Sequence, residues 1–254
     1  MNLFSSEVKA RYRSFIRALF CELEARSIGY CVLRNYEGLP DEPSYDIDIL
    51  VSQNCLKQLR KIIPSFAKKC GWLPYQIQRH ANVSINFYLC HKLDNRTFLY
   101  LKLEFRTKLL VILPGKIRRQ EICYLSTDEV LSQSRIVNGI RVPAEPHEVV
   151  HLFCESVLVS KEKYWRRLFE KYARCKRDIW PYLIATFGEE GAQLASYLLE
   201  TQSPSACRKA APCLGNYICQ ANPWKLHEIL LHDISAIFNR LSMLFRPCGI
   251  LCLF

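Results

Sequence analysis

The chain carries several stretches in which apolar residues recur at helical spacing. The first covers about residues 7–26, with Gly29 where a C-terminal cap is expected. A second, roughly residues 55–69, contains Pro64, which predicts a kink in that helix. After Pro146 the helical spacing continues almost to the end of the chain. The pattern therefore predicts two early helices and a long helical C-terminal region.

Between these helices, shorter runs of apolar or alternating residues predict β-strands. They cover residues 30–34, 44–51, 83–89 and 98–106. The pair Asn138-Gly139, between two further short runs, is typical of a hairpin turn. Together the strands and helices predict an α+β fold, in which a small mixed β-sheet is backed by helices and followed by helices alone.

The order of these elements divides the chain into three segments. We expect an α+β domain in residues 1–145, a helical domain in residues 146–246, and a terminal strand or linker in residues 247–254. The chain has 254 residues, half of them hydrophobic, which is enough for one large domain or two small ones.

Composition narrows the class of protein. Lys and Arg number 35 against 24 Asp and Glu, so the formal net charge is +11, which suits an anionic partner such as a nucleotide, a nucleic acid, an acidic glycan or a membrane surface.

The 13 cysteines are scattered singly without a CxxC pair, which argues against a structural zinc site and for reduced, buried thiols. No apolar run approaches the roughly 20 residues of a membrane span, and we expect a cytoplasmic location.

Two aspartates within one predicted strand are the first candidate site. Side chains alternate along a strand, so Asp46 and Asp48 share one face while Ile47, Ile49 and Val51 occupy the other. Neighbouring carboxylates repel each other unless a positive group lies between them. Mg²⁺ prefers carboxylate oxygens and is often shared with substrate phosphates. The pair therefore predicts a Mg²⁺ (or Mn²⁺) site.

A third carboxylate is expected because two metal ions are difficult to hold with one pair of acids. Glu104 lies on the polar face of a strand whose other face is Leu and Phe, and it is our candidate; Asp94 lies in a turn and is expected to be solvated. The alternative is that all these acids form the wet face of a half-exposed sheet, without metal.

The residues around the aspartates resemble a known superfamily. The segment from Val32 to Pro40, followed by Asp46-Ile47-Asp48, is similar to nucleotidyltransferases of the DNA polymerase beta type. Within that superfamily it resembles an uncharacterised bacterial family, sometimes fused to a thymidylate-kinase-like domain. The similarity extends to residues 140–143 and 148–152, and so covers about the first 165 residues. It implies a divalent metal at the aspartates and a nucleoside triphosphate (NTP) in the adjoining cleft.

The nucleotide-binding residues predicted from this resemblance are basic or lie in a turn. Arg34 and Asn35 stand where the superfamily has a Gly-Ser or Gly-Gly turn, and the fork of an arginine matches phosphate geometry. Lys102 and Arg106 flank Glu104 on the same face of their strand, which places them near the nucleotide. The alternative for these two is cross-strand pairing with the acids, in a charge network without ligand.

Three functions remain open at this point. The first is a Mg²⁺-dependent transferase that moves a nucleoside monophosphate from an NTP to an unidentified acceptor, such as a sugar, glycan, lipid or protein. The second is a nucleotide-binding or docking module that acts beside a separately encoded P-loop kinase, because the apolar end of the chain resembles the approach to a P-loop but lacks the loop itself. The third, less favoured, is an RNA-binding protein.

Overall fold

The structure is a computed structural model, and it describes residues 6–42, 44–80, 83–94, 96–113 and 120–222. The strand predicted for residues 247–254 and the apolar pattern after residue 222 lie outside this description. Among the described residues, no helix combines the length and apolar character needed to cross a bilayer.

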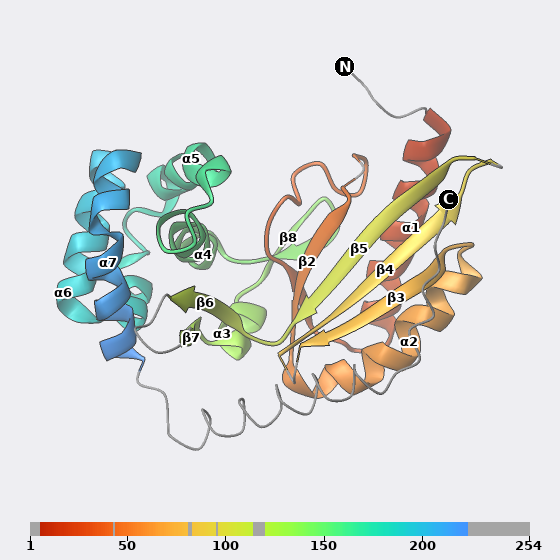
Figure 1. The fold of residues 1–254 in the computed structure, drawn as a ribbon, viewed down its shortest axis with the longest axis horizontal. Coiled ribbons are helices and arrows are strands. Elements are labelled where there is room, and N and C mark those ends of the chain that lie inside the picture. The colour runs from red at the N-terminus through yellow and green to blue at the C-terminus, as the bar shows by residue number, and fades with distance from the viewer. Residues whose placement is uncertain (1–5, 43, 81–82, 95, 114–119, 223–254) are drawn as a thin grey trace.

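A five-stranded mixed sheet forms the centre of the N-terminal half (Figure 1). In spatial order its strands are β1 (Tyr30–Val32), β2 (Asp46–Val51), β5 (Phe98–Arg106), β4 (Ser84–Lys92) and β3 (Leu73–His80). β2 and β5 pair in parallel, and the other neighbours pair antiparallel. The predicted α+β class with a small mixed sheet is confirmed.

Two helices cover the apolar face of this sheet. They are α1 (Ser6–Ala25) and α2 (Leu56–Lys69), the latter preceded by a 3-10 turn, η1 (Gln53–Cys55). Their apolar side chains, among them Phe15 and Leu59, are buried in one core with Ile47, Leu103 and Phe105 of the strands. The alternation seen in the sequence therefore directs the even-numbered side chains of β2 and β5 to the opposite, polar face.

The remaining helices gather beyond β2, on the far side from β3 (Figure 1). They are α4 (Glu145–Val157), η2 (Glu162–Tyr164), α5 (Trp165–Cys175), α6 (Trp180–Thr201) and α7 (Pro204–Ala221). The hairpin of β6 (Leu109–Leu113) and β7 (Gln120–Leu125), with α3 (Thr127–Ser132), packs into the same core as these helices. Cys31, Leu33 and Leu50 of the sheet region also join it, so side-chain packing is continuous between the two halves.

The hairpin predicted around Asn138-Gly139 is confirmed as β8 (Arg135–Val137) and β9 (Ile140–Val142). Both turn residues have positive φ, 51° for Asn138 and 76° for Gly139, a conformation that Asn and Gly tolerate. The sequence pattern missed β3, β6, β7 and α3. β3 is an edge strand with most side chains partly or fully exposed, so it has no clean alternation to detect.

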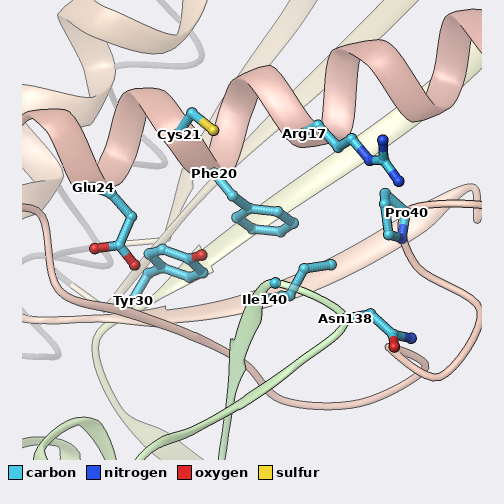
Figure 2. A pocket seen from close by; sticks show the side chains of 9 residues that line it. Arg17, Phe20, Cys21, Glu24, Tyr30, Pro40, Asn138 and Ile140 are labelled. Atoms are coloured by element: carbon cyan, nitrogen blue, oxygen red, sulfur yellow. The ribbon is translucent and has the colours of Figure 1, made fainter.

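A pocket of about 480 Å³ lies between α1 and the β8–β9 hairpin (Figure 2). Phe20 and Tyr30 line the pocket, and their rings stack with centroids 4.9 Å apart. Arg17 and Glu24 of α1 also line it. The pocket lies on the face of the sheet that α1 covers, opposite the face that carries the aspartates. The described cysteines are free thiols, but Cys21 at this pocket is exposed, which corrects the expectation that they are buried.

Candidate metal and nucleotide site

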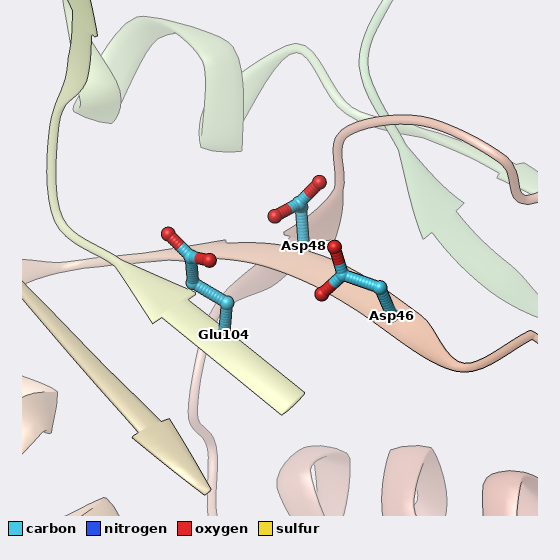
Figure 3. Close-up of side chains that lie close together, drawn as sticks. All are labelled: Asp46, Asp48 and Glu104. Atoms are coloured by element: carbon cyan, nitrogen blue, oxygen red, sulfur yellow. The ribbon is translucent and has the colours of Figure 1, made fainter. Parts of the chain in front are cut away.

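Three carboxylates meet on the polar face of the sheet (Figure 3). Asp46 and Asp48 extend from β2, and Glu104 extends from β5 directly opposite Asp48 in the parallel register. One oxygen from each lies within 4.8 Å of the others. The structure therefore brings together the three acids that the sequence singled out, and their role as metal ligands stays a prediction.

The three acids differ in burial. The side chain of Asp48 is 3% exposed, that of Glu104 13% and that of Asp46 51%. Oδ1 of Asp48 is buried and accepts no hydrogen bond among the described residues; its nearest cation is Arg106 Nη2, at 3.5 Å. The cluster thus extends from a buried carboxylate, Asp48, to a solvent-exposed one, Asp46. A site that binds a ligand from solution needs such an exposed side.

These acids fit a hard divalent cation. All the donors are carboxylate oxygens, the ligand type that Mg²⁺ and Mn²⁺ share. Oδ1 of Asp48 is a buried acceptor without a hydrogen bond, and its ion-pair partner Arg106 is 3.5 Å away, so it keeps room for a closer cation. The metal ligands would be Asp46, Asp48 and Glu104.

Two basic side chains of β5 pair with the acids. Lys102 Nζ lies 2.7 Å from Glu104 Oε2 and 3.3 Å from Asp46 Oδ1. Arg106 Nε lies 2.6 Å from Glu104 Oε1. The cross-strand network considered as an alternative is therefore present in the structure.

Arg34 is held behind the acids rather than extended toward solvent. Its Nε donates to Asp48 Oδ2 at 2.5 Å, its Nη1 donates to Glu155 Oε2 at 2.5 Å, and its guanidinium lies 5.3 Å from the centre of the Tyr164 ring. The side chain is only 7% exposed. The neighbouring Asn35 is exposed, with φ of 58°, so its predicted role in nucleotide binding stays a prediction.

The surrounding charges decide the protonation of the buried acids. Burial raises the pKa of Asp48, but the nearby guanidinium groups of Arg34 and Arg106 outweigh burial and hold that pKa below its usual value. Burial likewise opposes ionisation of Glu155, yet His151 in its protonated form, together with Arg34 and Lys161, lowers the pKa of Glu155 to about 2. Both carboxylates are therefore charged at neutral pH.

Sequence reasoning missed the contribution of α4 to this site. Glu155, on α4, pairs with Arg34 and with Lys161, and one turn earlier His151 Nδ1 lies 2.5 Å from the hydroxyl of Tyr124. Burial lowers the pKa of His151 to about 4, so the ring is neutral. The signal was present, because Glu155 and His151 lie one turn apart in a helix that is otherwise apolar around this region.

A second buried cluster joins the loop after β1 to the C-terminal helices. Glu148 on α4 is fully buried. It accepts from the Tyr36 hydroxyl at 2.6 Å and from Arg167 at 2.5 Å, and it forms an ion pair with Lys171 at 2.9 Å. The ring of Tyr36 lies under the guanidinium of Arg167, 4.9 Å from its centre. This cluster fixes the loop that carries Arg34 against α4 and α5.

No protein-family model matches the sequence, and no curated protein matches it either. Among solved structures, the chain is similar to JHP933 from Helicobacter pylori, with 13% identity, a TM-score of 0.41, and coverage of 94% of this chain and 100% of that one. A second, described as a "putative nucleotidyltransferase from H. pylori", has 12% identity, a TM-score of 0.38, and coverage of 83% and 99%.

Proposed function

We propose that this chain is a Mg²⁺- or Mn²⁺-dependent nucleotidyltransferase that moves a nucleoside monophosphate from an NTP to an acceptor. The observation that carries the proposal is the convergence of Asp46, Asp48 and Glu104 within 4.8 Å on one sheet face, with a buried oxygen of Asp48 that accepts no hydrogen bond. Nucleotidyl transfer needs positioned charge more than covalent help from the protein.

Each charged residue has a role in this proposal. A divalent ion held by the three carboxylates would neutralise charge on the triphosphate. Arg34 orients Asp48, since it holds one of its oxygens at 2.5 Å. Lys102, released from Asp46 and Glu104, would contact the triphosphate. Glu104 would also accept the proton of the attacking hydroxyl.

The most informative variant is Asp46→Asn. Asp46 is half-exposed and its cation, Lys102, lies 3.3 Å away, so removing its charge should change the free energy of unfolding by less than about 1 kcal/mol. We expect transfer from a labelled NTP, measured with Mn²⁺ in a cell extract that supplies acceptors, to fall at least about 100-fold.

Asp41→Asn is the matched control. Asp41 is also half-exposed and pairs with Arg13 at 2.6 Å, in the loop before β2 and outside the acid cluster. We expect this variant to transfer at the wild-type rate. Unchanged transfer by Asp46→Asn, with the fold intact by circular dichroism, would remove the metal from the proposed mechanism.

A second candidate function is a non-catalytic nucleotide-binding module that acts beside a separately encoded P-loop kinase. The observation that favours it is charge balance. Among the described residues, the ion pairs around the site match Asp46, Asp48, Glu104 and Glu155 with Arg34, Lys102, Arg106 and Lys161. Carboxylates that are already paired with cations do not require a metal ion to balance their charge. Calorimetry that detects Mn²⁺-dependent NTP binding, with no label transferred, would support this candidate.

A further inference from the structure

A cluster of aromatic rings lies on the same sheet face as the carboxylates. The ring of Tyr75 on β3 lies 6.1 Å from the rings of both Tyr88 on β4 and Tyr100 on β5, and Phe98 lies 6.4 Å from Tyr100. Tyr75 is 53% exposed and Tyr100 45% exposed. Large aromatic side chains grouped in the open are a feature of binding surfaces. We call these four residues the tyrosine face.

Amide side chains separate the tyrosine face from the carboxylates. Asn86 pairs in register with Glu104 on one side and with Gln78 on the other, and Gln78 accepts from the Tyr88 hydroxyl at 3.0 Å. Asn86 is only 5% exposed, and its Oδ1 is buried without a hydrogen bond among the described residues. The tyrosine face therefore presents exposed aromatic rings, and the buried Oδ1 of Asn86 beside it accepts no hydrogen bond among the described residues.

The charge of the tyrosine face selects among ligands. β3 and β4 contain no Asp or Glu. Lys92 pairs in register with Phe98, and Lys102 pairs with Tyr88. The carboxylate of Asp94, in the turn between β4 and β5, accepts from the backbone N–H groups of the residues that follow it. Lys92 thus places a positive charge at one end of the rings, and Lys102, which also pairs with Glu104 and Asp46, lies at the other end. A polyanion would find its electrostatic complement mainly at Lys92.

We propose that the tyrosine face binds single-stranded nucleic acid, whose bases stack on Tyr75 and Tyr100, and that the end of this strand is the acceptor. Stacking on aromatic rings beside cationic groups is how single strands are held without sequence preference. Tyr100 precedes Glu104 by four residues on β5, or roughly 13 Å, a distance that a strand of a few nucleotides spans. The acceptor role rests on the proposed function, whereas the binding step does not.

The test is fluorescence anisotropy with a labelled single-stranded RNA of about 12 nucleotides. We expect Tyr75→Ala and Tyr100→Ala each to weaken binding about 5-fold or more, and Tyr100→Phe, which keeps the ring, to bind within about 2-fold of wild type. Tyr197→Ala is the matched control, since Tyr197 is 63% exposed on α6, outside the tyrosine face, and it should bind as wild type. Affinity should also fall steeply between about 50 and 200 mM salt.

Three results would overturn the proposal. The first is unchanged RNA affinity in both alanine variants, which would place any binding elsewhere. The second is equal affinity for a duplex of the same sequence, because paired bases cannot stack on the rings. The third is no RNA binding but binding of a neutral oligosaccharide that Tyr100→Ala abolishes, which would make the face a glycan site.

Asp46→Asn separates this inference from the proposed function. We expect this variant to bind RNA as wild type while losing transfer. If wild type binds RNA through Tyr75 and Tyr100 but transfers no nucleotide to it from any NTP, the transferase proposal fails for this acceptor and the binding site stands. If label passes to another acceptor equally well in wild type and Tyr100→Ala, the transferase stands and the acceptor inference fails.

Discussion

The guanidinium of Arg34 is shared between two buried carboxylates, those of Asp48 and Glu155. Burying charges costs several kcal/mol, and this cost is offset only while each charge keeps its partner. Without Arg34, Glu155 would keep Lys161, but Asp48 would keep only Arg106, whose Nη2 is 3.5 Å away. Arg34 therefore acts as a structural clamp as well as a residue of the candidate site.

We predict that Arg34→Met lowers the free energy of unfolding by about 3 kcal/mol, since it leaves two buried carboxylates short of a cation. Urea denaturation followed by circular dichroism measures this change. The control is Arg13→Met, whose partner Asp41 is half-exposed, and its effect should stay within about 1 kcal/mol. Equal effects of the two substitutions would contradict the clamp.

At the scale of elements, the loop after β1 is attached to α4 and α5 by Tyr36. Its hydroxyl donates to Glu148 and accepts from Lys171 at 2.8 Å, and both partners are buried or nearly so. Because this loop carries Arg34 and Asn35, these hydrogen bonds also position the edge of the candidate site. Loss of the hydroxyl would leave Glu148 with only its arginine and lysine partners.

We predict that Tyr36→Phe lowers the free energy of unfolding by about 1–3 kcal/mol, the cost of removing a buried partner from charged groups. Hydrogen exchange of residues 33–42 should accelerate by more than that of β5, because the loop would open locally while the sheet stays intact. Tyr197→Phe, at an exposed tyrosine, should change neither measurement. Uniform acceleration across the sheet would instead indicate global destabilisation.

β2 and β5 were predictable from the sequence because each has one apolar, buried face. Apolar and polar residues alternate along β2 and β5, because Ile47 and Leu103 pack in the core with α1 and α2. This alternation predicts that the acids lie on the opposite face of the sheet. β6 and β7 were missed although they also carry buried side chains, such as Val111 and Ile122. β3 lies at the sheet edge, and its exposed side chains carry no period. Glu155 was missed because its partner, Arg34, lies in another element. The spacing of apolar residues in α4 predicts a helix but does not indicate which distant residue pairs with its buried acid.

At the scale of the whole molecule, stability should depend on pH through α4. The pKa of His151 is lowered to about 4 by burial, so below its ordinary value near 6.5 the unfolded chain binds a proton that the folded protein does not. Stability therefore falls as the pH drops from about 6.5 to 4. Glu155, with its pKa lowered to about 2, stabilises the fold above about 4.5 and loses this contribution between 4.5 and 2.

We predict that His151→Asn flattens the first part of this dependence. Between pH 8 and pH 5, wild type should lose about 2 kcal/mol more of its free energy of unfolding than the variant, as follows from the lowered pKa. Urea denaturation at several pH values provides the measurement. His80→Asn, at an exposed histidine, should follow the wild-type curve, and identical curves for all three proteins would show that His151 does not titrate in this way.

The parallel pairing of β2 with β5 has a kinetic consequence. Asp48 and Glu104 are 56 positions apart in the sequence, and Arg34 and Glu155 are 121 apart. Contacts between such distant residues raise the contact order, and chains of high contact order fold slowly because long loops must close first. During synthesis from the N-terminus, Asp48 therefore has no partner on β5, and Arg34 none on α4, until those later elements have been made and have folded. Only then are the charges of the site balanced.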